Sequence, residues 1–286
     1  MRSMLFVPGD RAERFDKAVA SGADAVIFDL EDSVAPAARP QARHDIAHYI
    51  RNAPRDLPLW VRINPVANEH ALEDIAAVVS ARPDGILLPK ARTGDDLRRL
   101  DHWLEALEVT HMHEPGSIKV IALVTESAGA VLNAASFAHT PARVTGFTWG
   151  AEDLAADIGA AGNRAESGEF EFAFRLARTS CLLMAAAAGV AAIDTIDTEF
   201  RDTQALEARA KGSRRDGFIG KLAIHPAQIA PIHAAFSPSA EEIDWARRVI
   251  EAFAGAPGMG ALAMDGRMID RPHMKQAERI LAAARR

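Results

Sequence analysis

Short apolar runs alternate with amphipathic stretches along most of the chain. Each run is bounded by glycine, proline or aspartate, and the eight runs cover residues 3–7, 25–30, 59–63, 85–88, 119–124, 144–149, 192–196 and 218–224. Short runs that are apolar throughout are typical of parallel strands buried on both faces. The segments between the runs have helical periodicity, as at residues 11–20, 69–80, 95–107, 170–188 and 204–211. The pattern therefore predicts strands and helices in regular alternation.

This alternation predicts a parallel sheet, and a count of eight strands favours its closure into a (β/α)₈ TIM barrel of the α/β class. An open nucleotide-binding sheet would need spaced glycines in the turn after the first strand. Residues 7–10 read Val-Pro-Gly-Asp and do not supply them. The barrel is therefore the predicted fold.

The chain continues well beyond the last predicted strand, to residue 286, which is more than one closing helix requires. Helices are predicted there at residues 239–254 and 272–286. Between them lie a glycine-rich break at residues 255–260 and an extended segment at residues 261–269 that turns at Asp265-Gly266. We expect a catalytic barrel over residues 1–236. Residues 237–286 are expected to form a C-terminal helical lid extension, which is a candidate lid or subunit contact.

The composition is that of an ordinary globular protein, with 49% hydrophobic and 25% charged residues. No apolar run approaches the ~18 residues of a membrane span, and charges come too early for a secretory signal. The net charge of −6 argues against nucleic acid as a partner. Cys181 is the single cysteine, which fits a reducing compartment and excludes a thiolate metal site. We expect a cytoplasmic protein.

Polar side chains gather where the predicted strands end. In a TIM barrel these C-terminal ends meet on one face, and that face carries the working groups of barrel enzymes. The polar side chains at or just after the ends of the second to sixth runs are Asp29, Glu31, Asp32, Arg62, Lys90, Glu126 and Asp153. The sequence therefore predicts an active site at this end of the barrel.

Glu126 and Asp153 follow neighbouring strands and form the candidate metal site. Mg²⁺ is commonly held by one or two carboxylates, with water and substrate oxygens in its other positions. Each carboxylate could instead cap the helix that follows, and a lone Asp153 would be better explained in this way. The pair favours magnesium, because Asp29, Glu31 and Asp32 can accept hydrogen bonds from metal-bound water. Direct ligation by these three acids is a weaker alternative.

Arg62 is the candidate substrate-binding cation. Its guanidinium suits bidentate binding of a substrate carboxylate, but an ion pair with an acid of the same cluster is about equally well supported. Lys90 and Lys221 raise the alternative of Schiff-base chemistry. A buried lysine paired with a carboxylate is the more common outcome, so Lys90 is assigned to the surroundings of the metal site. Cys181 is interpreted as a core residue and His225 as a turn residue.

Taken in order, these motifs resemble those of the citrate lyase β-subunit-like (CitE-like) enzymes of the HpcH/HpaI aldolase superfamily. They are most similar to citramalyl-CoA and malyl-CoA lyases. The matching residues are 2–3, 6–9, 29–33, 61–64, 88–90, 125–128, 150–153, 217–221, 224–229 and 265–270. The resemblance covers essentially the whole chain.

The resemblance implies that Glu126 and Asp153 bind Mg²⁺ and that Arg62 contacts the 2-oxoacid part of the substrate. Backbone amides that would hold its carboxylate belong to Gly150, Ala151 and Glu152.

The resemblance also implies that residues 237–286 pack on or over a neighbouring subunit's active site and supply a general acid or base to it. Asp270 is the best match for this residue, and Asp265 is the second. A shared site of this kind implies a homo-oligomer, either a trimer or a hexamer.

The implied activity is that of a magnesium-dependent carbon–carbon lyase. Such an enzyme cleaves a 3-hydroxyacyl-CoA thioester, such as citramalyl-CoA or malyl-CoA, to acetyl-CoA and a 2-oxoacid, or forms the thioester from these two compounds. Alternatives are a malyl-CoA thioesterase, a malate synthase-like activity and the β subunit of a citrate lyase complex. A metabolite-binding barrel without catalysis is an alternative of another class. The 2-oxoacid stays open, because one methylene changes binding by only ~1–3 kcal/mol.

Overall fold

The computed structural model describes residues 1–54 and 56–285. Eight parallel strands follow one another around a closed barrel, and the last strand pairs with the first. Their bounds are β1 (Ser3–Pro8), β2 (Ala25–Asp29), β3 (Leu59–Arg62), β4 (Gly85–Leu88), β5 (Lys119–Leu123), β6 (Val144–Thr148), β7 (Ala191–Asp194) and β8 (Gly220–Ala223). Each strand overlaps one predicted run, so the predicted barrel is confirmed.

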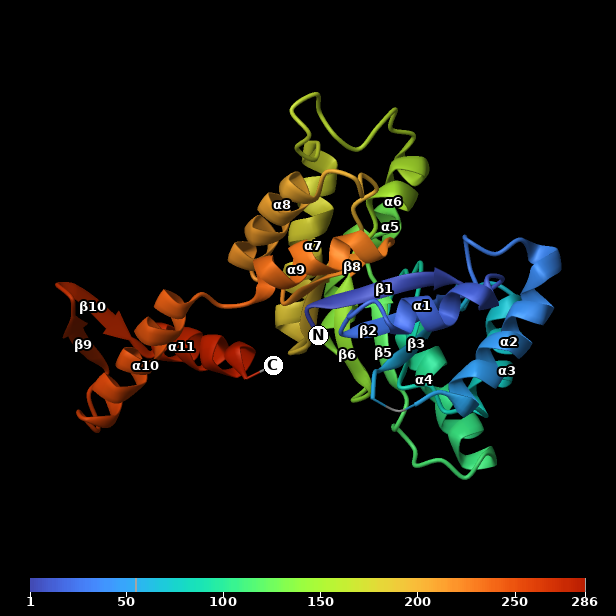
Figure 1. Cartoon of the computed structure of the whole chain (residues 1–286), viewed down its shortest axis with the longest axis horizontal. Helices are drawn as coiled ribbons and strands as arrows, with labels where there is room; N and C mark the ends of the chain where they lie inside the picture. Colours follow the sequence, from blue (N-terminus) through green and yellow to red (C-terminus); the bar gives the residue numbers. More distant parts are fainter. Residues whose placement is uncertain (55, 286) are drawn as a thin grey trace. The chain divides into compact units, whose positions relative to one another are not determined.

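Helices connect the strands and lie outside them (Figure 1). Their bounds are α1 (Phe15–Val19), α2 (Arg39–Asn52), α3 (His70–Val79), α4 (Gly94–Thr110), α5 (Ala128–Leu132), α6 (Ala151–Ile158), α7 (Phe172–Ala188), α8 (Thr203–Asp216) and α9 (Ile229–Phe236). Short 3₁₀ turns are η1 (Ala12–Arg14), η2 (Pro36–Ala38), η3 (Ala134–Ala138) and η4 (Pro226–Gln228). The sequence pattern had not predicted α2, where Ala42, Ile46, Ala47 and Ile50 are the buried positions in an otherwise polar stretch.

Side chains fill the interior of the barrel, so it is a packed core and not a pore. The buried interior cluster consists of Met4, Ala25, Ile27, Trp60, Leu87, Ile121, Leu123, Ile193 and Leu222. Because side chains alternate along a strand, the residue two positions after an interior residue also faces inward. Asp29 follows Ile27 by two positions and Arg62 follows Trp60 by two. This register explains why these polar side chains reach the C-terminal mouth.

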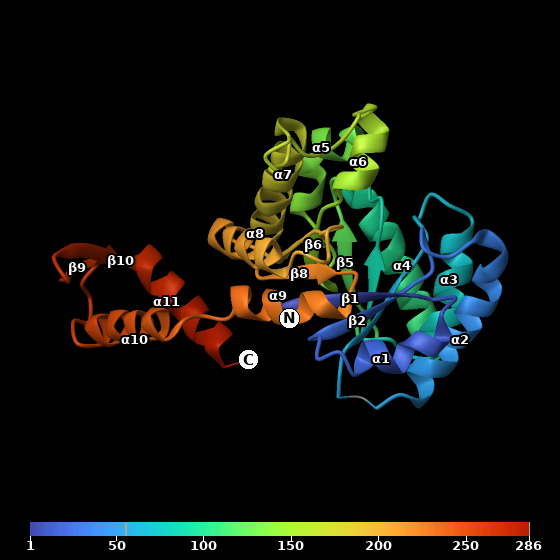
Figure 2. The same ribbon diagram turned by 45° about the horizontal axis from the view of Figure 1, so that its top comes forward.

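Residues 236–286 form a second compact unit, and residues 1–235 form the first. In the second unit, α10 (Ala240–Ala254) begins after Ser239, which forms a capping box with Glu242. The remaining elements are β9 (Ala261–Met264), β10 (Arg267–Asp270) and α11 (Arg271–Ala284). The two strands pair antiparallel and lie next to α10 and α11 (Figure 2).

The turn between β9 and β10 is at Asp265 and Gly266, as predicted, and both residues have positive φ, 52° and 72°. The buried core of this unit is small, with Ala246, Val249, Ile269 and Ala277 as its fully covered members. Among the described residues, no helix combines the length and the apolar character needed to cross a bilayer.

Candidate active site

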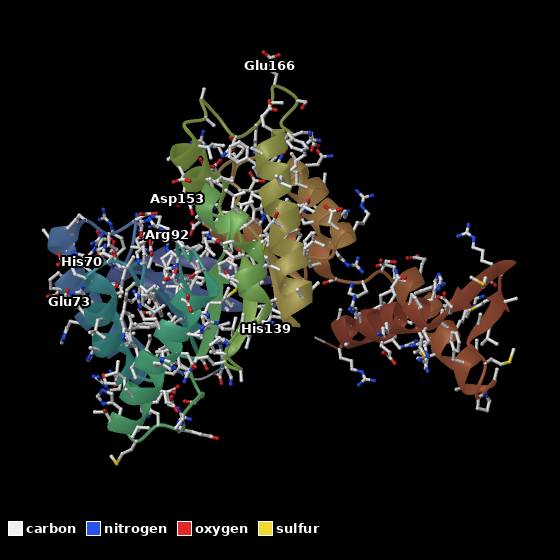
Figure 3. The ribbon with its side chains drawn as sticks, turned by 180° about the vertical axis from the view of Figure 1, so that it is seen from behind. His70, Glu73, Arg92, His139, Asp153 and Glu166 are labelled. Carbon is white, nitrogen blue, oxygen red and sulfur yellow. The ribbon has the colours of Figure 1, made fainter. Side chains whose placement is uncertain are left out.

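The polar residues predicted for the barrel mouth do come together in space. Asp153 lies on the first turn of α6, and Glu166 lies at the tip of the loop between α6 and α7 (Figure 3). Ion pairs and hydrogen bonds connect Asp29, Glu31, Asp32, Arg62, Lys90, Glu126 and Asp153. We call this set of seven residues the mouth cluster.

Arg62 is held by acids of the mouth cluster, so the ion-pair alternative of the sequence analysis is confirmed. Its Nε and Nη2 donate to Asp29 Oδ1 and Oδ2 at 2.6 and 2.7 Å, and its Nη1 lies 2.9 Å from Glu31 Oε2. Burial opposes ionisation of Asp29, but Arg62 outweighs it and lowers the pKa of Asp29. A guanidinium has five N–H groups, and these contacts use three. Two donors are left for another anion.

Asp29 therefore serves chiefly as the partner of Arg62. Its two oxygens also accept from the backbone N–H groups of Glu31 and Ser33 at 3.0 and 3.1 Å, and from the Ser33 hydroxyl. With so many donors, Asp29 has little capacity for metal-bound water. The feature of the sequence that indicates this role is the Asp-x-x-x-Ser spacing, which places the Ser33 hydroxyl beside the Asp29 carboxylate.

Lys90 contacts Glu31 as well and joins it to two further acids of the cluster. Its Nζ lies 2.6 Å from Glu31 Oε1, 3.2 Å from Asp32 Oδ2 and 3.1 Å from Asp153 Oδ1. The backbone of Lys90 is left-handed, with φ 53°, a conformation that costs free energy in a non-glycine residue. In this conformation the Lys90 N–H donates to Glu126 Oε2 at 2.5 Å. Lys90 thus positions Glu126 through its backbone N–H and Asp153 through its Nζ.

Neither candidate metal ligand is a helix cap. Ser127 caps α5, accepting a hydrogen bond from Ala130 N, and Gly150 precedes α6 without any side-chain cap bond. Glu126 is 5% exposed, and burial together with the nearby Asp153 carboxylate raises its pKa. A buried carboxylate whose charge is disfavoured in this way is one that a bound cation would stabilise.

Gly150 provides the space in which the Glu126 carboxylate lies. A Cβ atom at position 150 would lie 2.7 Å from Glu126 Cγ and 2.8 Å from Glu126 Oε1. The backbone of Gly150 is extended, with φ −129° and ψ 123°, so any residue could adopt it. Glycine is therefore needed at position 150 only because a larger residue would collide with the candidate metal ligand Glu126.

The charges of the mouth cluster do not balance. Its five carboxylates, four of them on buried or partly buried residues, face only the two cations Arg62 and Lys90. Burial raises the pKa of Glu31 to about 7, despite its ion pairs with Arg62 and Lys90. This excess of hard oxygen donors fits a divalent cation. Among the described residues no group of three acidic, His or Cys side chains forms a closed site, and Mg²⁺ requires only one or two carboxylates.

The start of α6 presents backbone N–H groups beside these carboxylates. Because no side chain caps this helix, its first amides, at Ala151 and Glu152, are not satisfied by a capping group. Free amides at a helix N-terminus favour a bound anion. The Glu152 side chain is turned to the α6–α7 loop, where Asn163 Nδ2 donates to its Oε1 at 2.8 Å.

Two buried threonines lie beside this site. Thr125 directly precedes Glu126 and belongs to the matching segment 125–128, whereas Thr148 ends β6 and was not singled out in the sequence. Both are fully buried, and their hydroxyls have no hydrogen-bond partner among the described residues. The signal that could have indicated Thr148 is the alternation along β6, which places it on the inward face.

The other candidate nucleophiles have structural environments. Lys221 is 3% exposed and donates to Asp194 Oδ2 at 3.0 Å and to the Thr195 carbonyl at 2.6 Å. Burial raises the pKa of the Cys181 thiol well above its usual range. His225 precedes η4 and accepts from Ala227 N at 3.1 Å. The core, ion-pair and turn interpretations of these residues are confirmed.

The two C-terminal aspartates differ in their partners. Asp265 lies in the β9–β10 turn, and both its oxygens are 2.5 Å from Arg248 Nη2. Asp270 precedes α11, about one-third of its side chain is exposed, and its Oδ1 lies 2.6 Å from His273 Nδ1. His273 was not singled out in the sequence, although its i+3 spacing is that of a capping box. Asp265 pairs with an arginine of α10, which leaves Asp270 the better candidate acid.

Comparison with known proteins identifies relatives along the whole chain. Residues 2–226 match the family described as HpcH/HpaI aldolase/citrate lyase, and residues 184–286 match the C-C bond lyase family of the TIM-barrel fold. The chain is 34% identical over 286 residues to citrate lyase subunit beta of Escherichia coli K12, covering 99% of this chain and 93% of that protein. It is also 34% identical over 286 residues to a (3S)-malyl-CoA thioesterase of Cereibacter sphaeroides, covering 99% and 94%.

A solved structure of high similarity is that of the protein CitE from Mycobacterium tuberculosis in complex with magnesium, acetoacetate and coenzyme A. Its TM-score is 0.80 at 33% identity, and the match covers 100% of this chain and 98% of that chain. A further structure of the M. tuberculosis protein, in complex with magnesium and pyruvate, matches with a TM-score of 0.74 at 32% identity, covering 98% and 97%.

Proposed function

Because the chain belongs to the HpcH/HpaI aldolase/citrate lyase family, we propose that it is a magnesium-dependent carbon–carbon lyase acting on a 3-hydroxyacyl-CoA thioester. Citramalyl-CoA and malyl-CoA are the proposed substrates, and acetyl-CoA and a 2-oxoacid are the products. The observation that carries this proposal is the Glu126–Asp153 carboxylate pair beside Arg62. Magnesium, coenzyme A and small oxoacids in the related M. tuberculosis structures support it.

Glu126 and Asp153 would hold the metal, and Glu31 and Asp32 would orient its water ligands. When bound, Mg²⁺ supplies a Lewis acid that stabilises negative charge on substrate oxygens. The two remaining N–H donors of Arg62 bind the carboxylate of the 2-oxoacid part. The amides at the start of α6 can bind the same anion, since the helix macrodipole favours negative charge there. These contacts fix the oxoacid with its reacting carbon beside the carboxylate pair.

The reaction proceeds in a retro-Claisen sense. The substrate hydroxyl gives its proton to a water molecule, the adjacent carbon–carbon bond breaks, and the hydroxyl carbon becomes the carbonyl of the 2-oxoacid. The bonding electrons pass to the thioester part as an enolate, and an acid delivers a proton to its carbon to give acetyl-CoA. The proton released by the hydroxyl balances the one that the enolate takes up. In the reverse direction the same group removes that proton.

We further propose that Asp270 of a neighbouring subunit is this acid, in a trimer or a hexamer. The carboxyl group of Asp270 is partly exposed, as a group that must meet a substrate has to be. The second compact unit has only a four-residue buried core, so it gains stability by packing on another surface. Packing on a neighbouring subunit would therefore stabilise this unit and bring its Asp270 to that subunit's active site.

Gly150→Ala is expected to lower turnover by about 10²-fold, because a reacting group displaced by about 1 Å loses this much. The new methyl group must displace the Glu126 carboxylate, which the Lys90 amide holds in place. The extended backbone accepts alanine, so the protein should fold normally. Steady-state kinetics and thermal unfolding, measured together, check both expectations.

Gly162→Ala is the matched control for this variant. It adds the same methyl group in the α6–α7 loop, where a Cβ would meet nothing within 4 Å. Turnover equal to that of the wild type is expected. Equal loss in both variants would show that the space around Glu126 is not the cause.

Product analysis tests the proposed function itself. The purified protein is incubated with malyl-CoA and citramalyl-CoA, with MgCl₂ or with EDTA, and the products are identified by mass spectrometry. We expect acetyl-CoA with glyoxylate or pyruvate in the presence of magnesium only. Absence of cleavage with every thioester would contradict lyase activity.

A thioesterase is the second candidate, and the malyl-CoA thioesterase of C. sphaeroides is the observation that favours it. Hydrolysis would give malate and free CoA in equal amounts, with no acetyl-CoA left at the end of the reaction. The β subunit of a citrate lyase complex is the third candidate, favoured by the E. coli relative. It would act on an acyl group attached to a carrier protein.

A further inference from the structure

A buried carboxylate on β7 connects the barrel wall to the segment that carries Asp153. Asp194 is 4% exposed, and its Oδ1 accepts a hydrogen bond from the indole Nε1 of Trp149 at 2.7 Å. Its Oδ2 accepts from Ser213 Oγ on α8 at 2.7 Å and from Lys221 Nζ on β8 at 3.0 Å. Only the bond to Trp149 leads toward the mouth cluster, because Trp149 directly precedes Gly150 and the first turn of α6.

We propose that Asp194 is a positioning residue for the metal site: through the indole of Trp149 it fixes the turn between β6 and α6 and so places Asp153. This inference rests on the proposed function, since it concerns the same carboxylate pair. Asp194 itself touches neither the candidate metal ligands nor the substrate anion site in any contact described above. Its effect is transmitted through the side chain of Trp149.

The turn needs such an anchor because it lacks the usual one. Helices are commonly fixed at their start by a side-chain cap, and Gly150 cannot provide one. A capping side chain at position 150 would also displace the Glu126 carboxylate. Two large apolar residues help to hold α6: Trp149 before it and Leu154 within it, which are 0% and 2% exposed. They occupy the two positions of a hydrophobic staple.

The hydrogen bond gives the Trp149 ring a single orientation. Phe170 packs against the ring edge to face, with centroids 5.0 Å apart, but such a contact restricts its rotation only loosely. The indole N–H is fully buried, so leaving it unpaired costs free energy and any other rotamer loses its acceptor. Burial alone would raise the pKa of Asp194, but Lys221 and Arg178 lower it to about 2. The acceptor is therefore charged, and the bond is a strong one.

Two variants that each remove one donor to the same carboxylate separate positioning from general stability. Trp149→Phe removes the indole N–H on the side of the metal site. Ser213→Ala removes a hydroxyl on α8, away from it. Because phenylalanine is also smaller than tryptophan, a second replacement at position 149 uses 3-benzothienylalanine, which keeps the ring size and has sulfur in place of the N–H.

The measurement is the binding of Mn²⁺, whose preference for carboxylate and water ligands is that of Mg²⁺. The loss of the free-ion signal in electron paramagnetic resonance gives the affinity without any turnover, and thermal unfolding is recorded in parallel. Both changes at position 149 should weaken Mn²⁺ binding by about tenfold, as loss of an outer hydrogen bond does at other metal sites. Ser213→Ala should bind Mn²⁺ as the wild type does.

The outcomes distinguish a failure of the positioning role of Asp194 from a failure of the proposed metal site. Wild-type affinity in both Trp149 variants would overturn the positioning role and leave the proposed function intact. Equal weakening in Ser213→Ala would also overturn it, because the effect would then follow the general stability of the Asp194 network. A wild-type protein that binds no Mn²⁺ would overturn the metal site and, with it, this inference.

Discussion

Asp153→Ala is expected to lower lyase turnover by about 10²–10³-fold or more, since it removes a contact that stabilises charge in the transition state. Glu126→Ala should have an effect of the same size. Neither residue caps a helix, so neither is needed for α5 or α6 to form. In magnesium-free buffer, Asp153→Ala should unfold at the same temperature as the wild type or at a higher one. It removes one negative charge from a cluster of five carboxylates and two cations.

Kinetics and thermal unfolding with and without MgCl₂ check this combination of effects. Magnesium should raise the unfolding temperature of the wild type, because it binds the folded state, and should not raise that of Asp153→Ala. Glu166→Gln is the matched control, since it removes one negative charge from the exposed tip of the α6–α7 loop (Figure 3). A folded Asp153→Ala protein with near-normal turnover in metal-free buffer would refute the metal assignment.

Asp270→Asn is expected to lower turnover by about 10²–10⁴-fold, the range that general acid–base catalysis contributes. Binding of the 2-oxoacid should survive, because Arg62 and the α6 amides lie in the barrel unit. Arg62→Ala should lose that binding. If each site combines Arg62 of one subunit with Asp270 of another, a mixture of the two inactive variants should recover activity. With equal amounts and random assembly, about a quarter of the sites contain both residues.

Mass spectrometry of the mixed oligomers provides the control, since it shows whether the subunits have exchanged. Oxoacid binding to each variant, measured by calorimetry, shows which half of the site has been lost. No recovery of activity in fully exchanged oligomers would mean that Asp270 acts within its own chain or not at all. Asp265→Asn is the companion variant, and it is expected to weaken the Arg248 ion pair without abolishing turnover.

The strands and the position of the site could be predicted because both follow from local pattern. A parallel strand covered on both faces leaves a short continuous apolar run, and the polar residue at its end marks the mouth of the barrel. Helix α2 could not be predicted in the same way. Its four buried positions have helical spacing, but two of them are alanines and the stretch around them is polar, so the apolar signal is weak.

The pairing within the site could not be predicted, because it depends on which strands lie side by side. Arg62 was equally consistent with a substrate carboxylate or an acid of the same cluster, and only the β2–β3 register places Asp29 directly opposite. Gly150 was expected to supply a backbone amide, and its crowding against Glu126 is visible only in three dimensions. The bond between Trp149 and Asp194 spans 45 residues and has no local signal.

The measurement that tests the central claim most directly is a crystal structure of the protein grown with MgCl₂ and pyruvate. Our account predicts one metal ion bound by carboxylate oxygens of Glu126 and Asp153, with pyruvate oxygens completing its coordination. It also predicts the pyruvate carboxylate within hydrogen-bonding distance of the α6 amides or of Arg62. A metal ion bound elsewhere, or pyruvate remote from these three side chains, would contradict the account.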